Sequence, residues 1–591
     1  MKKIKIIIAC CIGIFLCMLD TTIMNIALPA IQNGLHVPLN QLSWPLNIYT
    51  ILFASLTIPL GKLAEKIGMN KFYCWGLCLF IIGSFISGFS KCLNILIIGR
   101  GIQSIGAAII FPLSMTIGIN TTSVKARSKV IAALGVTQGL AAALGPVIGG
   151  MVTQFWGWKW IFFINIPLMI IALILCVTSF NFKEKHLTSK IDVLGAILSI
   201  ISLSTFTLAL VQGREWGWKS FTILSLFAIS LIFIILFIIC EKKSKYPMIP
   251  LDLFKNKEFN GAALSIVLSN LFLVTVTVVL PTYFTKLQNK TELEAALLIT
   301  PISAMIFIFS PIAGVLIDKI SPRKIIGIGF TLMTIAFLMF STINMNDYKI
   351  VRIACLLLGS GYGIIAGPNT VLAASNFTGK LLNASQSVAG VLREVGIVLS
   401  VAIYVTGLYN NVATAKDNSI YHVYTEVAKL NIPDNKKKIV ANKSITSIKN
   451  ENTNSSTETN HFTTEEKNKL IKQNYKQVIQ GKDNLPIIVK HQIYNSVVNK
   501  VNLKIKDINS QINKKITNIK QYTHNQFNKA FVKLYRYSTP FVFLSIFSFL
   551  LFDKKRIDSS KEYSKIEKSK EKVLFILNET NIKIFLKIIN I

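Results

Sequence analysis

Acidic side chains are scarce in this sequence, and so are charged residues altogether. Its 591 residues include 28 Asp and Glu against 63 Lys and Arg, and only 15% of all residues are charged. Hydrophobic residues make up 52% of the chain, and the mean hydropathy is +0.53. A soluble protein of this length carries far more charge. The composition therefore predicts an integral membrane protein.

Motifs of soluble enzymes and of nucleotide-driven pumps are also absent. The sequence contains no phosphate-binding GxxxxGK[ST] loop, no HExxH and no GxSxG, so we expect neither an enzyme nor direct use of ATP. Its nine cysteines form no CxxC pair and no zinc spacing, and all lie in or beside apolar stretches. We expect no catalytic residues, no metal and no cofactor, with an ion gradient as the energy source.

Fourteen apolar stretches have the length of a membrane-spanning helix, which takes about 20 residues. The first follows Met1, Lys2 and Lys3 as in a signal peptide, but its length and the many stretches after it favour a transmembrane helix. The expected fold class is therefore an all-α integral membrane protein. The stretches are 6–29, 45–64, 73–90, 93–116, 130–153, 161–180, 191–211, 221–240, 260–284, 295–316, 324–343, 350–373, 386–409 and 538–552.

The basic residues predict how the chain is oriented. Lys and Arg are more numerous in one set of alternating short loops than in the other, and the richer set is expected in the cytoplasm. Both termini then lie inside. The net charge of +35 could indicate nucleic-acid binding, but loops and a tail that orient membrane helices need this charge, so we expect no nucleic-acid partner.

Two parts of the chain are too polar to span a membrane. Residues 410–537 are rich in Asn and Lys and form an insert that we expect outside the cell. Apolar residues at helical spacing from about Thr463 onwards predict a helical hairpin or helix pair in it. Residues 553–591 are expected as a basic cytoplasmic tail, whose end is either disordered or an amphipathic helix on the inner leaflet.

Asp20 lies within the apolar first stretch, in LDTTIMNIALP (19–29). Inserting an aspartate at the centre of a membrane helix costs about 2.5–3.5 kcal/mol on insertion scales. We therefore expect Asp20 to have a functional or structural role. A buried carboxylate can take up a proton near neutral pH, and when ionised it can meet water or a cationic substrate. The alternative is a structural carboxylate bonded to Asn25, Thr21 or another helix.

Two further ionisable residues lie at membrane depth. Arg100 is part of the fourth stretch and needs a partner or water, unless it reaches the interface. Glu394 is a candidate second proton or cation site in the thirteenth stretch. Its neighbour Arg393 points about 100° away around a helix, so the two need not pair. Asp192 begins the seventh stretch and is expected to cap a helix.

A similar short turn occurs twice, as GKLAEKIGMNK (61–71) and GVLIDKISPRK (314–324). Each has a glycine, an acid four residues later and a basic cluster. Two copies in corresponding halves indicate internal duplication. Glu65 and Asp318 can pair with Lys or Arg between the halves or cap helices. A plain basic inner loop is the alternative.

The stretch LGVTQGLAAALGPVIGG (134–150) combines small residues with a proline. Gly139, Gly145, Gly149 and Gly150 allow close helix packing, and Pro146 predicts a kink. Either a static packing face or a kink at a moving interface fits this pattern.

In order along the chain, these motifs resemble those of a known family. LDTTIMNIALP, GKLAEKIGMNK, GRGIQSIGAA, GVTQGLAAALGPVIGG and WGWKWIFFINIP are similar to the motif series of the fourteen-span drug:proton antiporters of the major facilitator superfamily. The resemblance covers roughly residues 10–410. It implies two six-helix bundles plus two extra helices, with an alternating-access cavity between the bundles. The implied parts are 1–180 for the first bundle, 181–258 for the two extra helices, and 259–409 with 538–552 for the second bundle.

The resemblance also assigns roles to residues. Asp20 matches an aspartate linked to proton coupling, and Arg100 matches the arginine of a proton-relay motif. Gly61, Glu65, Gly68 and Lys71 match a gating loop, although the family usually has aspartate where Glu65 stands. The antiporter motif is matched by Gly139, Gly145, Pro146, Gly149 and Gly150.

The expected function is proton-coupled efflux of lipophilic, cationic drugs or toxic compounds across a bacterial cytoplasmic membrane. The partners are then a small-molecule substrate, protons and the lipid bilayer, and we expect a monomer. Aromatic residues such as Tyr49, Phe162 and Phe163 are candidates for the pocket lining. One alternative is a transporter of the same fold for a natural metabolite, peptide or siderophore. Another is a non-transporting membrane scaffold that acts through residues 410–537.

Overall fold

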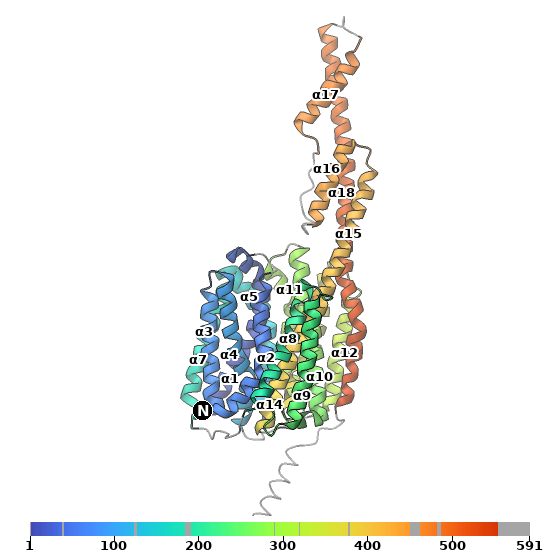
Figure 1. Ribbon diagram of the computed structural model, residues 1–591. Coiled ribbons are helices and arrows are strands. Elements are labelled where there is room, and N and C mark those ends of the chain that lie inside the picture. The colour runs from blue at the N-terminus through green and yellow to red at the C-terminus, as the bar shows by residue number, and fades with distance from the viewer. Residues whose placement is uncertain are drawn as a thin grey trace, which may run out of the picture. The chain divides into compact units, whose positions relative to one another are not determined.

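The described chain is all-helical (Figure 1). This computed structural model describes residues 2–37, 41–122, 127–183, 191–288, 290–317, 319–375, 377, 379–449, 461–481 and 486–552. In these residues 13 helices are long and apolar enough to cross a membrane, or 14 if the bent helix α5 counts as one span. The predicted all-α membrane fold is therefore confirmed, while the predicted tail 553–591 lies outside the described residues.

The first half of the chain forms one helix bundle. Its main packing pairs are α3 with α4, α1 with α5 and α7, and α2 with α4. Every one of these helices is rich in apolar residues, and their buried faces also carry the few polar side chains considered below. The helices are α1 (Lys2–Leu35), α2 (Ser43–Ile67), α3 (Met69–Gly88), α4 (Leu93–Asn120), α5 (Arg127–Trp156), α6 (Trp160–Phe163) and α7 (Asn165–Ser179).

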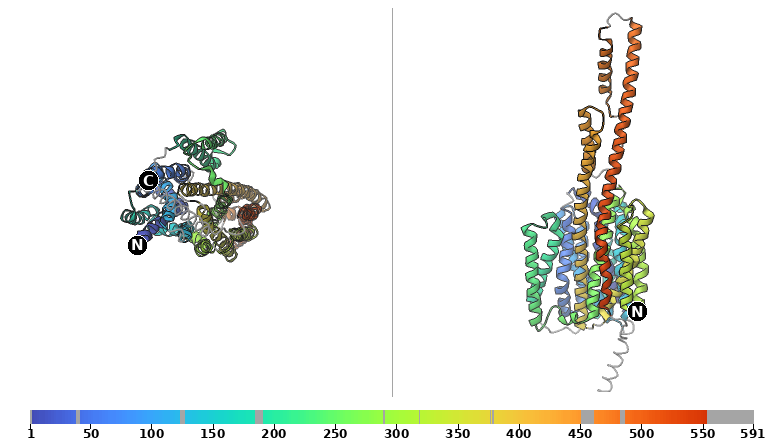
Figure 2. Two further views of the ribbon diagram at one scale, coloured as in Figure 1. Left: turned by 90° about the horizontal axis from the view of Figure 1, so that it is seen from below. Right: turned by 90° about the vertical axis from the view of Figure 1, so that its right-hand side faces the viewer.

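Two helices, α8 (Val193–Trp216) and α9 (Phe221–Lys243), follow as a pair. Asp192 caps α8 by accepting a hydrogen bond from the Gly195 backbone N–H at 2.8 Å, as predicted. The pair stands at the edge of the helix bundle (Figure 2). Only 11% of an apolar 18-residue segment of α9 is buried inside the protein. Such a surface is suited to lipid.

The second half forms the other bundle, in which α13 packs against both α11 and α12, and α12 packs against η4. The π-helical turn η3 joins α14 to α15 without a break. The elements are η2 (Leu251–Lys255), α10 (Lys257–Lys286), α11 (Glu292–Leu316), α12 (Pro322–Phe340), α13 (Tyr348–Ser375), α14 (Gly379–Ser400), η3 (Val401–Val405), the end of α18 (Ile487–Ile546) and η4 (Phe547–Leu551).

The two bundles meet along two main contacts, α5 against α11 and α13, and α14 against α2 and α4. Helix α5 bends by 44° between 133–141 and 144–156. Pro146 explains the bend, because proline lacks an N–H and its ring clashes with the carbonyl four residues earlier. The predicted kink is confirmed. It lies in α5, which packs against α1 of its own bundle and against α11 and α13 of the other bundle.

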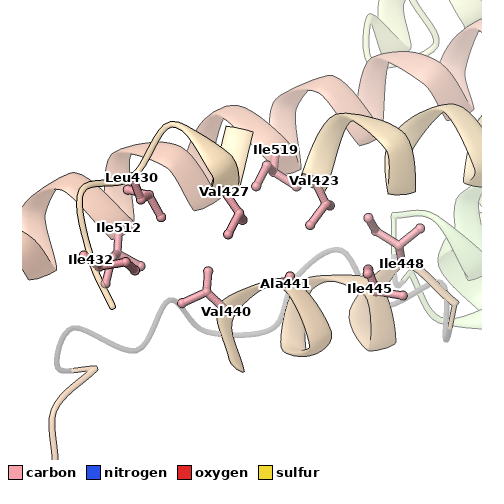
Figure 3. Packing of buried hydrophobic residues seen from close by; sticks show 10 residues of the cluster. All are labelled: Val423, Val427, Leu430, Ile432, Val440, Ala441, Ile445, Ile448, Ile512 and Ile519. Carbon is pink, nitrogen blue, oxygen red and sulfur yellow. The ribbon is translucent and has the colours of Figure 1, made fainter. Parts of the chain in front are cut away.

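Residues 407–534, together with 282–290, form a second compact unit. It contains the body of α15 (Thr406–Ala428), α16 (Asp434–Lys449), α17 (Thr464–Ile479) and most of α18. A cluster of buried residues joins α15, α16 and α18 (Figure 3). Ile471 of α17 packs on Val497, Val501 and Ile505 of α18 in a second cluster. The predicted helix near Thr463 is confirmed, and Thr463 caps it.

Ion pairs add to the apolar clusters of this unit. Glu426 pairs with Lys429, which lies in the turn after α15, and with Lys515 of α18 at 2.6 Å. Hydrogen bonds from Lys429 and Lys515 lower the pKa of Glu426 from 4.5 to about 2. Lys436 of α16 pairs with Glu466 of α17 at 2.6 Å and lowers the pKa of that carboxyl. These pairs connect helices that are distant in sequence.

Candidate functional site

Asp20 of α1 and Arg100 of α4 form an ion pair in the interior of the first bundle. Arg100 Nη1 donates to Asp20 Oδ2. Asp20 is 0% exposed and Arg100 is 1% exposed. Burying two charges is favourable only when the geometry is good and the remaining polar atoms are bonded. The sequence marked both residues as sites, and the structure brings them together.

Amide side chains complete the hydrogen bonds of this pair. Gln103 Nε2 donates to Asp20 Oδ1 at 2.9 Å, and Asn165 Nδ2 of α7 donates to the same oxygen at 3.4 Å. Gln103 Oε1 accepts from Arg100 Nη1 at 2.8 Å, and its Nε2 also reaches Ser84 Oγ at 3.0 Å. Both oxygens of Asp20 are thus bonded within the protein, by partners on α4 and α7.

Arg100 also makes contacts on its other side. Its Nε donates to the Pro45 carbonyl at 3.3 Å, and its guanidinium lies 4.2 Å from the ring centroid of Tyr49 and 5.9 Å from that of Phe162. A cation over an aromatic face is stabilised when it is shielded from water. Tyr49 and Phe162 therefore cover the arginine, and they do not line the central cavity described below. Phe163 instead packs on Phe89.

The glycines of α5 hold it against α1 next to Asp20. A Cβ atom on Gly145 would overlap Thr22 Oγ1, and one on Gly149 would lie 2.9 Å from the Ile23 carbonyl oxygen. Only glycine permits this approach. The α1 residues in this contact, Thr22 and Ile23, lie two and three positions after Asp20. A shift of α1 at Asp20 would therefore displace α5 directly.

Further along α5, the glycines face the second bundle instead. A Cβ on Gly139 would lie 2.8 Å from Ile306 Cγ2 of α11, and one on Gly135 would lie 3.2 Å from Thr370 Oγ1 of α13. Pro146 and Gly150 are buried in the same helix. Helix α5 therefore contacts α1 with one set of glycines and the opposite bundle with another, on either side of its bend.

The α2–α14 contact joins the bundles at the end that carries the α2–α3 turn. Asn383 Nδ2 of α14 donates to the Gly61 carbonyl and to Glu65 Oε1, both at 2.9 Å. A Cβ atom on Gly61 would lie only 2.5 Å from Ser387 Oγ of α14, so the two helices pack closely here. Glu65 pairs with Lys62 of its own helix at 3.2 Å. Of the options that the sequence left open for Glu65, the described residues show an ion pair within its own helix and, across the two halves, a hydrogen bond from an amide.

The turn itself is built around Gly68. Its φ of 111° is a conformation that glycine adopts readily, and it allows α2 to end and α3 to begin at once. Lys71 lies 5.4 Å from the ring centroid of Trp75. Asp318, the corresponding acid of the second copy, lies outside the described residues, so its predicted pairing is not described.

A small cavity of about 40 Å³, the central cavity, lies between the bundles, with walls from α4, α5, α10, α13 and α14. Such a volume admits a few water molecules at most. Its polar lining includes Asn270 and Tyr362, whose hydroxyl donates to Asn270 Oδ1 at 3.0 Å. Asn369 and Arg393 are also among the lining residues. The described structure therefore leaves little free space at this contact between the bundles.

Glu394 lies in α14 beside Arg393 and is 1% exposed. Its Oε1 has no hydrogen-bond partner among the described residues. The two side chains form no ion pair within that part of the chain, as their separation around the helix predicted. Glu394 is therefore a buried carboxylate with a free acceptor, unlike Asp20.

Several residues of the site were not predicted. Asn165 bonds Asp20, Asn383 joins the bundles, and Asn270, Tyr362 and Asn369 line the cavity. The available signal was a polar side chain in an apolar stretch, which marks a position that must find a partner. Among the described residues, no group of three or more His, Cys, Asp or Glu could hold a metal ion.

Comparisons with known proteins agree with this architecture. The sequence profile of the Major Facilitator Superfamily matches residues 10–401. The chain is 30% identical over 397 residues to the Multidrug transporter protein MdtP of Bacillus subtilis (strain 168), covering 67% of this chain and 73% of that protein. It is 32% identical to the Riboflavin transporter RibZ of Clostridioides difficile (strain 630), covering 62% and 80% respectively.

A third relative is the Methylenomycin A resistance protein of Bacillus subtilis (strain 168), with 28% identity over 68% of this chain and 86% of that protein. The profile match covers well over half of the chain, and it includes the Asp20–Arg100 pair, the α5 glycines and the α2–α14 contact. These findings confirm the resemblance seen in the motifs: the chain belongs to the Major Facilitator Superfamily of membrane transporters.

Proposed function

We propose that this transporter exports small lipophilic compounds, such as drugs or toxic metabolites, in exchange for protons across a bacterial cytoplasmic membrane. The observation that carries the proposal is the buried ion pair of Asp20 and Arg100. One proton can change this buried network, because neutralising the carboxylate leaves the guanidinium without its counter-ion.

The contacts of Asp20 suggest how one proton moves the helices. Protonation of Asp20 removes the charge that holds Arg100, and the α1 segment that follows Asp20 is free to shift. Gly145 and Gly149 pass this shift to α5, because they have no side chain of their own and pack directly on Thr22 and Ile23 of α1. Gly139 lies on the same helix against α11 of the other bundle. Two packed arrangements of these helices would then expose the cavity alternately to the two sides.

The α2–α14 contact is the proposed gate at the other end of this motion. Asn383 binds both the carbonyl of Gly61 and the carboxylate of Glu65, so both bonds break together when the bundles separate there. On this proposal this end and both termini face the cytoplasm, which is the side that the basic loop residues favour. The protein acts as a monomer on this proposal, and the proton gradient supplies the energy, with no resident cofactor.

The charge of the exported compound is a separate question. Both oxygens of Asp20 are already bonded within the protein, so in this arrangement a cationic compound would meet Glu394 rather than Asp20. The named relatives include a multidrug, a riboflavin and a methylenomycin A resistance or transport protein. A natural metabolite, peptide or siderophore therefore remains a second candidate for the cargo of the same transport cycle.

Uptake into inverted membrane vesicles with an acidic interior tests this function. The vesicles would be supplied with ethidium, rhodamine 123 or fluorescein, and vesicles without the protein serve as the control. We expect at least one dye to accumulate, and a proton ionophore to abolish the accumulation. Uptake that survives the ionophore would contradict proton coupling. A folded protein that moves none of the dyes would favour the natural-cargo or scaffold alternatives.

A further inference from the structure

Arg393 of α14 is a buried guanidinium that forms no hydrogen bond or ion pair with the described residues. Its side chain lines the central cavity and the residue is 6% exposed. Neither its Nε nor its Nη1 has a hydrogen-bond acceptor among the described residues. In the same part of the chain no carboxylate oxygen lies within 4.0 Å of it. The ring of Phe111 lies 5.8 Å from the guanidinium carbon, and the carboxylate of the neighbouring Glu394 acts on the guanidinium electrostatically without forming an ion pair or hydrogen bond with it.

Such an arrangement is unfavourable unless something is added to it. A buried charge needs a counter-ion or a full set of hydrogen bonds, and an edge-of-range aromatic contact replaces neither. Arg100 in the same protein shows what a satisfied arginine has: a carboxylate, an amide oxygen, a carbonyl and an aromatic face. Among the described residues, Arg393 directly contacts only an aromatic ring, that of Phe111.

The cavity around Arg393 contains hydrogen-bonding groups but no acid. Amides and hydroxyls from α5, α10, α13 and α14 line it, and none of its lining residues is Asp or Glu. Asn369 Nδ2 is held by Ser265 at 3.0 Å, whereas its Oδ1 has no donor among the described residues. Tyr362 is fixed by Asn270. The cavity thus presents one cation with free donors and one free acceptor on an ordered polar frame.

We propose that Arg393 is the specificity-determining residue of the central cavity and that it binds a planar, oxygen-rich anionic group of the cargo, such as a carboxylate. A guanidinium offers donors in a fixed fork that matches such a group. Asn369 Oδ1 accepts a hydrogen bond from a donor elsewhere on the same molecule. The inference rests on the proposed transport function and reverses the charge that Asp20 alone would suggest for the cargo.

Two dyes built on the same three-ring scaffold test this assignment, anionic fluorescein and cationic rhodamine 123. Fluorescence anisotropy measures their binding to the purified full-length protein in detergent, without any proton gradient. We expect fluorescein to bind at least tenfold more tightly than rhodamine 123. Arg393→Gln should weaken fluorescein binding at least tenfold and leave rhodamine 123 unchanged or tighter, with Arg393→Lys in between.

Matched variants separate this effect from misfolding and from a failure of proton coupling. Arg352→Gln removes an exposed arginine of α13 and should change neither dye. Asp20→Asn should keep the preference for fluorescein, because binding does not require a proton gradient. Size-exclusion elution checks that each variant is folded. Tighter binding of rhodamine 123 by the wild type, no binding of fluorescein, or equal weakening of both dyes in Arg393→Gln would overturn the assignment.

Discussion

Replacing Arg100 by methionine would leave Asp20 as a buried carboxylate held only by two amides. Asp20 is 0% exposed, and its remaining donors would be Gln103 at 2.9 Å and Asn165 at 3.4 Å. Breaking a buried ion pair from one side costs about 3–5 kcal/mol, because an uncompensated charge stays behind. Asp20→Asn leaves Arg100 in the opposite situation. The double variant Asp20→Asn/Arg100→Met removes both charges and should be more stable than the sum of the single losses predicts.

The free energy of unfolding of the four proteins, measured by SDS titration with tryptophan fluorescence, gives the coupling between the two residues. We expect a coupling of at least about 2 kcal/mol in favour of the double variant. The same cycle on the exposed pair Asp252 and Lys255, whose side chains are 70% and 82% exposed, should give no measurable coupling. If the losses at Asp20 and Arg100 simply add, the pair does not hold the two helices as described.

Three further predictions follow from particular contacts. Gly145→Ala should abolish dye uptake in vesicles because the added methyl group would overlap α1. Gly101→Ala is the control. Its Cβ would meet only ordinary contacts at 3.5 Å and beyond, so it should keep uptake near the wild-type level. The ionised carboxylate of Glu426 stabilises the folded insert at pH values above its ordinary pKa of 4.5. This stabilisation is lost as the pH falls toward about 2, the pKa of Glu426 in the folded protein. Proteolysis of the insert in the full chain should therefore be faster at pH 3 than at pH 6, and equal rates would refute this role of Glu426. Replacing residues 413–529 by a short Gly/Ser linker should leave transport intact, since α15 and α18 lie side by side just before and after this segment, where Asn411 bonds the Ala530 carbonyl at 3.1 Å. Loss of transport in a folded variant would contradict this expectation and would show that the transport cycle needs the segment.

The membrane fold could be predicted because its signals are local. Apolar stretches of sufficient length marked most of the spans, and Pro146 marked the bend of α5. The ionisable residues Asp20, Arg100 and Glu394 stood out for the same reason, since each is expensive at membrane depth. The spans, the bend and the ionisable residues could therefore each be predicted from one local stretch of sequence.

Partners could not be predicted in the same way, because they depend on how distant helices pack. Nothing near Asp20 in the sequence indicates that Arg100 binds it, and Asn25 and Thr21 were the local candidates. Thr21 Oγ1 instead donates to the Met18 carbonyl, while the side chain of Asn25 is outside the described ones. Likewise, α15 and α16 were missed because their sequences are polar, and their helices are stabilised by apolar residues contributed by α18.

The central claim is that Asp20 is the carboxylate through which a proton drives transport. The most direct test is dye uptake into inverted vesicles with an acidic interior, comparing wild type, Asp20→Asn and the exposed control Asp252→Asn at equal protein level. We expect uptake by the wild type and by Asp252→Asn, and none above background by Asp20→Asn. Gradient-dependent uptake by Asp20→Asn at the wild-type rate would contradict it and would make Glu394 the next coupling residue to test.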